Sequence, residues 1–159
     1  MLFRSFKPKV PRNVHTQLLT ISDIQYLTAD STRGALTIDI MAEFPVFYAN
    51  DEVLKLIRSQ VISNLAGDNF LTFEDDSVLR YFVDELKSEY IRNNEMVVEK
   101  LEKTGYLLLN NSFVMEGFSL LNDEQIFSYG ITRDIDFGGN HPTRTRFFYN
   151  YNLKNGALI

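Results

Sequence analysis

The stretch FSYGITRDIDFGGNHPTRTRFFYNYNL, residues 127–153, decides the fold. Apolar side chains recur at alternate positions between Phe127 and Phe137, and again between Phe147 and Leu153. A period of two is typical of β strands with one buried face, because successive side chains point to opposite sides. The glycines and the proline between the two runs favour a turn. The stretch therefore predicts two neighbouring strands of one sheet.

Three further strands are predicted upstream of this pair. Residues 36–44 alternate apolar and polar side chains until Pro45, which has no amide hydrogen for a ladder and ends the strand. Residues 19–26 alternate less regularly, and the change of phase predicts a β-bulge near Asp23. A period of two also returns over residues 107–120.

Helical spacing occupies the segment between these strands. Apolar residues recur every three to four positions over residues 54–65, and Gly67 then ends the helix. The same spacing begins near residues 75–77 and runs until Gly105, giving one more helix, or two if Asn93-Asn94 breaks it. The order is strand, strand, helix, helix, strand, strand, strand. It predicts an α+β fold in which an antiparallel sheet carries two or three helices on one face.

The length of 159 residues fits one domain. We expect residues 1–17, which are basic and contain two prolines, to form an arm, and residues 18–159 to form a single α+β domain. Asn155-Gly156 is a preferred hairpin turn, yet only three residues follow it. We therefore expect a C-terminally truncated domain whose last strand has an open edge, through which a homodimer could form.

Composition excludes several classes of function. The chain carries 16 Lys and Arg against 21 Asp and Glu, a formal net charge of -5, which disfavours a nucleic-acid partner. With no cysteine and two histidines, it has no disulfide, no thiolate zinc site and no three-histidine metal site. Its apolar runs are far shorter than the roughly 20 residues that span a membrane. We expect no cofactor.

The sequence has no motif typical of an enzyme. No serine stands in a glycine-framed nucleophile elbow, and the Gly138-Gly139 pair precedes a strand, whereas a phosphate-binding loop opens a helix. Asp134, Asp136 and His141 could together hold a metal ion, which leaves a metal-dependent enzyme as an alternative. The simpler interpretation places both aspartates on a solvated strand face and the histidine in a turn, so we predict no catalytic and no metal site.

Three side chains near the C-terminus are candidates for binding. Alternation places Phe147 and Tyr149 in the core, and it leaves Arg144, Arg146 and Phe148 on the opposite face of the last strand. An aromatic ring flanked by two guanidinium groups can form a surface for a partner. We therefore expect these three residues to face outward.

Two motifs carry a resemblance to a known family. Phe-Gly-Gly-Asn-His at 137–141 and Tyr-Asn-Tyr-Asn-Leu-Lys-Asn-Gly at 149–156 are similar to a signature of the types Tyr-x-Gly-Gly-Ala-His and Tyr-Asn-Phe-Asp-Leu-Lys-Thr-Gly. Asn140 stands where alanine is usual. The signature belongs to a bacterial cell-envelope domain of unknown function. That domain occurs in lipoproteins, beside polysaccharide deacetylase domains and in lysozyme-sensing anti-sigma factors, and the resemblance covers residues 36–159.

The resemblance implies a non-catalytic binding module of the cell envelope that contacts peptidoglycan, a lysozyme-like protein or another envelope protein. It also implies an alternative, an accessory domain of a polysaccharide-modifying enzyme such as a deacetylase. The chain as given shows no export signal, so a cytoplasmic interaction protein is a further alternative. The residues that we expect at the binding surface are Gly138, Gly139, His141, Arg144, Arg146 and Phe148. The paired glycines and the histidine also suit a purely structural role at the strand end.

Overall fold

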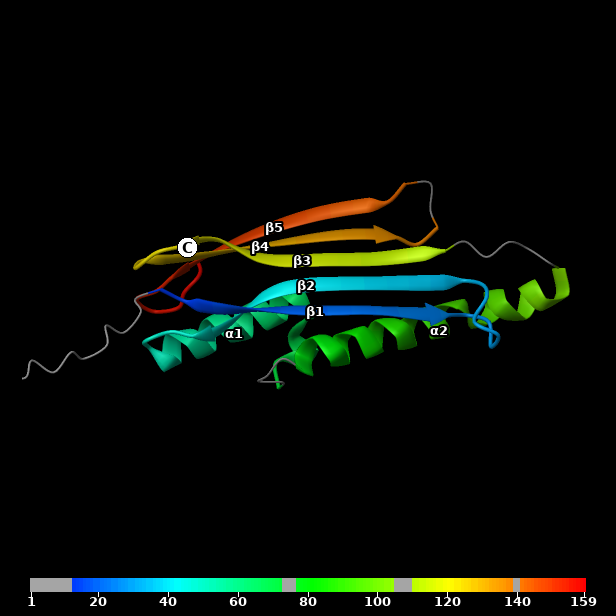
Figure 1. Ribbon diagram of the computed structural model, residues 1–159, viewed down its shortest axis with the longest axis horizontal. Helices are drawn as coiled ribbons and strands as arrows, with labels where there is room; N and C mark the ends of the chain where they lie inside the picture. Colours follow the sequence, from blue (N-terminus) through cyan, green and yellow to red (C-terminus); the bar gives the residue numbers. More distant parts are fainter. Residues whose placement is uncertain (1–12, 73–76, 105–109, 139–140) are drawn as a thin grey trace, which may run out of the picture.

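The computed structural model describes residues 13–72, 77–104, 110–138 and 141–159, with the backbone alone for 101–104. The elements, in chain order, are β1 (His15–Tyr26), β2 (Ala35–Phe47), α1 (Asp51–Leu65), the 3-10 helix η1 (Asp68–Phe70), α2 (Ser77–Thr104), β3 (Asn111–Asn122), β4 (Ile126–Asp136) and β5 (Thr143–Asn152). Both α helices lie between β2 and β3 in the chain, and they follow one another along the long axis of the sheet (Figure 1). The fold is α+β.

The five strands form one mostly antiparallel sheet in the order β1-β2-β3-β4-β5. The pairs β1–β2, β3–β4 and β4–β5 are antiparallel, but β2 and β3 run parallel, with Leu36 opposite Asn111 and Ala42 opposite Gly117. The expectation of an antiparallel sheet throughout is therefore wrong at this pair. Parallel neighbours need a long crossover, and here α1 and α2 return the chain to the end of the sheet where β2 began.

The core lies between one face of the sheet and the two helices. Alternate residues of β2 are nearly inaccessible to solvent, as the alternation predicts. The residues that meet there are Leu36, Ile38, Ile40, Ala42 and Phe44 from β2, Ile57, Val61 and Leu65 from α1, Leu79 and Val83 from α2, and Phe113, Met115, Phe127, Tyr129, Ile131 and Tyr151 from the other strands. The opposite face of the sheet, called the open face below, has no helix against it in the part of the chain described.

Helix α1 is capped at both ends by side chains. The Asn50 side chain accepts a hydrogen bond from the Val53 amide at 3.2 Å, which is the usual role of an N-cap asparagine. At the other end, the guanidinium of Arg133 donates from Nη2 to the carbonyl oxygens of Asn64 (2.6 Å) and Leu65 (3.2 Å). Arg133 occupies an inward position of β4, and it satisfies carbonyl groups that a helix end leaves free.

Helix α2 is one continuous helix, which decides between the two alternatives in favour of an unbroken helix through Asn93-Asn94. The Asn94 side chain donates to the carbonyl oxygen of Tyr90, four residues earlier, at 2.7 Å and thus bonds to its own helix. The C-terminal part of α2 extends past the end of the sheet (Figure 1). No helix in the described ranges is both long and apolar enough to span a membrane.

Strand β1 starts earlier than expected. It begins at His15, so residues 15–17 of the expected arm belong to the sheet, while residues 1–12 lie outside the described residues. The expected bulge near Asp23 is also wrong, because the register shift of β1 lies between His15 and Thr16. Asp23 keeps the regular register and reaches the covered face, where its carboxylate accepts a hydrogen bond from Lys87 of α2 at 3.0 Å.

The C-terminal residues turn back at Gly156, but the loop is longer than the two-residue hairpin expected at Asn155-Gly156, and Asn155 does not have a positive φ. Gly156 has a φ of 73°, which favours glycine, and its amide donates to the carbonyl oxygen of Asn152 at 2.7 Å. Leu158 then pairs with Tyr151, and the Ile159 amide donates to the carbonyl oxygen of Asn150 at 3.0 Å. The last three residues thus return along β5 and occupy one end of its outer edge.

We expect Arg133→Ala to lower the free energy of unfolding by about 1 to 3 kcal/mol, because it leaves the last carbonyls of α1 without their charged donor. Urea unfolding measures this change, with Arg146→Ala as the matched control. Arg146 is exposed on the open face of the adjacent strand, so its removal is expected to change stability by about 0.5 kcal/mol or less. Equal unfolding midpoints for Arg133→Ala and wild type would contradict this role.

Gly117 and Tyr129 form a tight contact across β3 and β4. A Cβ atom at Gly117 would collide with the Tyr129 hydroxyl and lie 3.1 Å from Leu65 Cδ2. Tyr129 is completely buried, and its hydroxyl has no hydrogen-bond partner among the described residues. This burial raises the pKa of Tyr129 far above its ordinary value.

We expect Tyr129→Phe to raise the free energy of unfolding by about 1 kcal/mol, because it removes a buried hydroxyl without a partner. Gly117→Ala should lower it by about 1 to 3 kcal/mol through overpacking. In the double variant, Gly117→Ala should lower the free energy of unfolding by a smaller amount, because the Tyr129 hydroxyl oxygen that the new Cβ atom would strike is absent. Additive changes in urea unfolding would show that the two positions do not interact.

Candidate functional site

The three outward residues predicted on the last strand lie together on the open face. In the β4–β5 register, Arg144 is opposite Asp134, Arg146 is opposite Thr132, and Phe148 is opposite Gly130. All three side chains are exposed, and Phe148 retains 61% of its accessible surface. Their outward orientation is confirmed, whereas their role in binding stays a prediction.

Apolar side chains gather on the open face around Gly130. Gly130 has no side chain, and the ring of Phe118 from β3 lies over it, with Cε2 2.8 Å from where a Cβ atom would stand. Leu120 reaches the same spot and is 55% exposed. Phe148 approaches from the other side, since it pairs with Gly130 across β4 and β5. We call Phe118, Leu120 and Phe148 the aromatic patch.

The sequence interpretation missed Phe118 and Leu120. Phe118 faces the open side as simple alternation from Phe113 requires, but nothing in the sequence indicates that its ring covers Gly130. Leu120, two residues further along, also faces the open side as alternation requires, but nothing in the sequence indicates that it reaches Gly130. The only available signal was the glycine inside an otherwise regular strand, which often marks a close approach of another group.

An ion pair borders the aromatic patch. Arg144 holds Asp134 with two hydrogen bonds, Nε to Oδ1 at 2.5 Å and Nη2 to Oδ2 at 2.8 Å. These hydrogen bonds, followed by the positive charge of Arg144, keep the pKa of Asp134 below its ordinary value. Both side chains remain partly open to solvent, so the pair is a surface feature that orients the Arg144 guanidinium.

The residues of the turn after β4 do not assemble into a metal site. The Asp136 carboxylate accepts a hydrogen bond from the Gly138 amide at 3.0 Å, and Gly138 has a φ of 76°. His141 is exposed, and Gly139 lies outside the described residues. Among the residues that the structure describes, no three histidine or carboxylate side chains gather as metal ligands. The metal-dependent alternative, which relied on Asp134, Asp136 and His141, therefore receives no support, and the positive φ of Gly138 is one that favours glycine.

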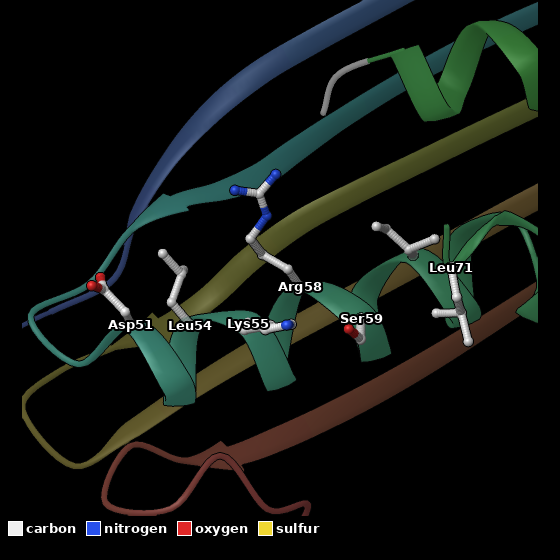
Figure 2. A pocket seen from close by; sticks show the side chains of 7 residues that line it. Asp51, Leu54, Lys55, Arg58, Ser59 and Leu71 are labelled. Atoms are coloured by element: carbon white, nitrogen blue, oxygen red, sulfur yellow. The ribbon is translucent and has the colours of Figure 1, made fainter. Parts of the chain in front are cut away.

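A cavity of about 270 Å³ lies along α1, on the other side of the sheet (Figure 2). Figure 2 shows Arg58 reaching from α1 toward β2, while Ser59 points the other way. The Arg58 guanidinium carbon is 5.1 Å from the centroid of the Phe44 ring, a cation–π distance. Asp51 and Lys55 bring charges of both signs to the lining, so the cavity has no clear preference for an anion or a cation.

Comparisons with known proteins identify the fold. No family model matches the chain, and no curated protein matches its sequence. A crystal structure of a DUF3298 family member from Bacteroides fragilis is similar, with a TM-score of 0.83 and 18% identity over 92% of this chain and 59% of that chain. A DUF3298 family protein from Pseudomonas aeruginosa gives a TM-score of 0.46 and 12% identity over 95% and 55%. The chain thus has the fold of part of a longer bacterial protein whose family has no assigned function.

We expect Arg144→Gln to raise the pKa of Asp134 toward its ordinary value. Because the folded-state pKa is lowered, the pair stabilises the folded protein at pH values above the ordinary value of 3.8, and that contribution is lost as the pH falls through the lowered pKa. An NMR titration of the Asp134 carboxyl carbon measures the shift. Arg146→Gln is the control, and it should move the pKa less, since Arg146 contributes only a weaker charge interaction.

Proposed function

We propose that this domain is a non-catalytic protein-binding module of the bacterial cell envelope and that its contact surface is the open face of β4 and β5. The observation that carries the proposal is the aromatic patch. Phe148 is 61% exposed and lies opposite Gly130 in the β4–β5 register, while Phe118 and Leu120 pack over Gly130 from β3. An exposed cluster of large apolar side chains with a polar border is typical of a surface that binds a partner.

The chemistry of the border favours a protein partner. Aromatic and arginine side chains are enriched at the centres of protein interfaces, and both types meet here. Arg144 is oriented by Asp134, so part of the entropy of fixing its side chain is already lost before binding. Arg146 lies beside Phe148 on the same face and adds a second guanidinium.

The two aspartates near the end of β4 are hydrogen-bonded within the protein, which supports a binding role for this face. Asp134 is engaged by Arg144, and Asp136 by the amide of Gly138. A general base or a metal ligand needs a carboxylate that is free to meet substrate or metal, and both of these are already bonded.

The envelope location and the identity of the partner rest on the resemblance described above. The motifs at 137–141 and 149–156 resemble an envelope domain that occurs in lysozyme-sensing proteins. The fold likeness to the DUF3298 family member is compatible with that resemblance. A lysozyme-like protein is therefore the partner that we propose to test first, with soluble peptidoglycan fragments as the competing ligand.

Calorimetric titration of the purified chain with lysozyme tests the proposal. We expect Phe148→Ala to weaken binding at least tenfold, about 1.4 kcal/mol, because the ring is the centre of the patch. Leu18→Ala is the matched control, since Leu18 is 57% exposed on the open face of β1, at the other edge of the sheet. An equal loss in both variants would contradict the proposed position of the surface.

The same titration with peptidoglycan fragments separates the two ligand classes. Saturable binding of the fragments, sensitive to Phe148→Ala and without any binding of lysozyme, would replace the protein partner by a glycan. No binding of either ligand by the folded chain would overturn the proposed partner.

A further inference from the structure

We infer that the cavity between α2 and the edge of the sheet where β2 and β3 begin binds a single neutral sugar residue. The cavity has a volume of about 260 Å³ and is lined by residues from α2, β2, β3 and the end of β4. It lies on the covered side of the sheet, opposite the aromatic patch. The inference therefore concerns a second site, separate from the proposed protein-binding surface.

Three polar side chains in the lining are held in fixed positions. The Tyr90 hydroxyl donates to the carbonyl oxygen of Gly34 at 3.1 Å and accepts from Asn111 Nδ2 at 3.1 Å. Asn94 Nδ2 donates to the carbonyl oxygen of Tyr90 at 2.7 Å. Both amide groups thus use Nδ2 within the protein, which orients their Oδ1 atoms before any ligand arrives.

Asn94 shows why a ligand with hydroxyl groups fits. Its side chain lines the cavity and is half-buried, and because Nδ2 bonds to the carbonyl oxygen of Tyr90, Oδ1 remains as an acceptor. A ligand hydroxyl is a donor of suitable size for this acceptor. The Oδ1 atom of Asn111 is closed off from solvent, so Asn111 contributes by holding the Tyr90 hydroxyl in place.

The rest of the lining suits the apolar face of a sugar ring. Phe137 follows the last residue of β4 and is 60% exposed, so its ring is available to a ligand. Leu36 and Phe113 line the same cavity and are almost fully buried. An aromatic ring combined with a few polar groups is the usual composition of a small-molecule site, and it matches a ring that has C–H groups on its face and hydroxyls on its rim.

Charge and size restrict the ligand further. Among the described residues, the lining has no lysine, arginine or histidine, so an anion would find no counter-charge. Glu89 is the one carboxylate of the described lining, and Arg92 lies 3.6 Å from it. The volume is below the roughly 300–1,000 Å³ of sites for larger ligands. A single neutral ring with hydroxyl or amide substituents fits these limits.

Proton–nitrogen NMR spectra of the full chain, recorded during titration with N-acetylglucosamine and separately with glucose, test the inference. We expect saturable shifts of the side-chain amides of Asn94 and Asn111 with at least one of the two sugars. Phe137→Ala and Asn94→Ala should each raise the dissociation constant at least fivefold. Phe137 is exposed, so Phe137→Ala is expected to keep the fold and remains informative if Asn94→Ala does not.

Matched controls locate the site and the ligand class. Phe148→Ala removes a comparably exposed phenylalanine from the opposite face and should leave sugar binding unchanged. Inorganic phosphate should give no saturable shifts of the two amides. Sugar binding that is lost in Phe148→Ala but kept in Phe137→Ala would overturn this site, as would the absence of saturable shifts with both sugars. Neither result bears on lysozyme binding at the open face, so the two proposals fail independently.

Discussion

The parallel pairing of β2 with β3 is the constraint on which the rest of the structure depends. Two parallel neighbours cannot be joined by a hairpin, so the 63 residues between Phe47 and Asn111 must return the chain along the sheet. They do so as α1, η1 and α2, which bury their apolar stripes against one face of the sheet. The other face keeps no helix in the described part of the chain, and among the exposed apolar side chains on it are Leu18, Leu120 and Phe148.

Each helix is tied to the sheet by a polar residue at an inward strand position. Asp23 of β1 bonds to Lys87 of α2, and Arg133 of β4 bonds to the end carbonyls of α1. In the sequence these residues interrupt the apolar alternation, and the interruption at Asp23 predicts a bulge that the structure does not contain. A charged side chain is tolerated on the covered face of a sheet when it pairs with an opposite charge or with the unpaired carbonyl groups at the end of a helix, because this pairing offsets the cost of burying the charge.

The two proposed binding surfaces arise from the two faces of the same hairpin region. Gly130 leaves room on the open face, where the ring of Phe118 packs over it and Phe148 lies opposite it on β5. On the covered side, β4 ends at Asp136, and the next residue, Phe137, lines the cavity beside Asn111. The same strand therefore holds Gly130 beneath the aromatic patch and leads at its end to Phe137 at the cavity, so the two surfaces lie on opposite faces of the sheet and at different positions along β4.

The sequence by itself determined the types of the elements and the outward position of Arg144, Arg146 and Phe148, because the periods of two and of three to four residues are local properties of the chain. Its placement of Phe147 in the core is wrong, since that side chain is 42% exposed. It also determined the turn at Gly156, since a positive φ favours glycine. Only the tertiary structure decided that β2 and β3 are parallel, that Arg133 caps α1 and that Phe118 covers Gly130. These contacts join residues far apart in sequence, and no local pattern specifies which distant group will meet a given side chain.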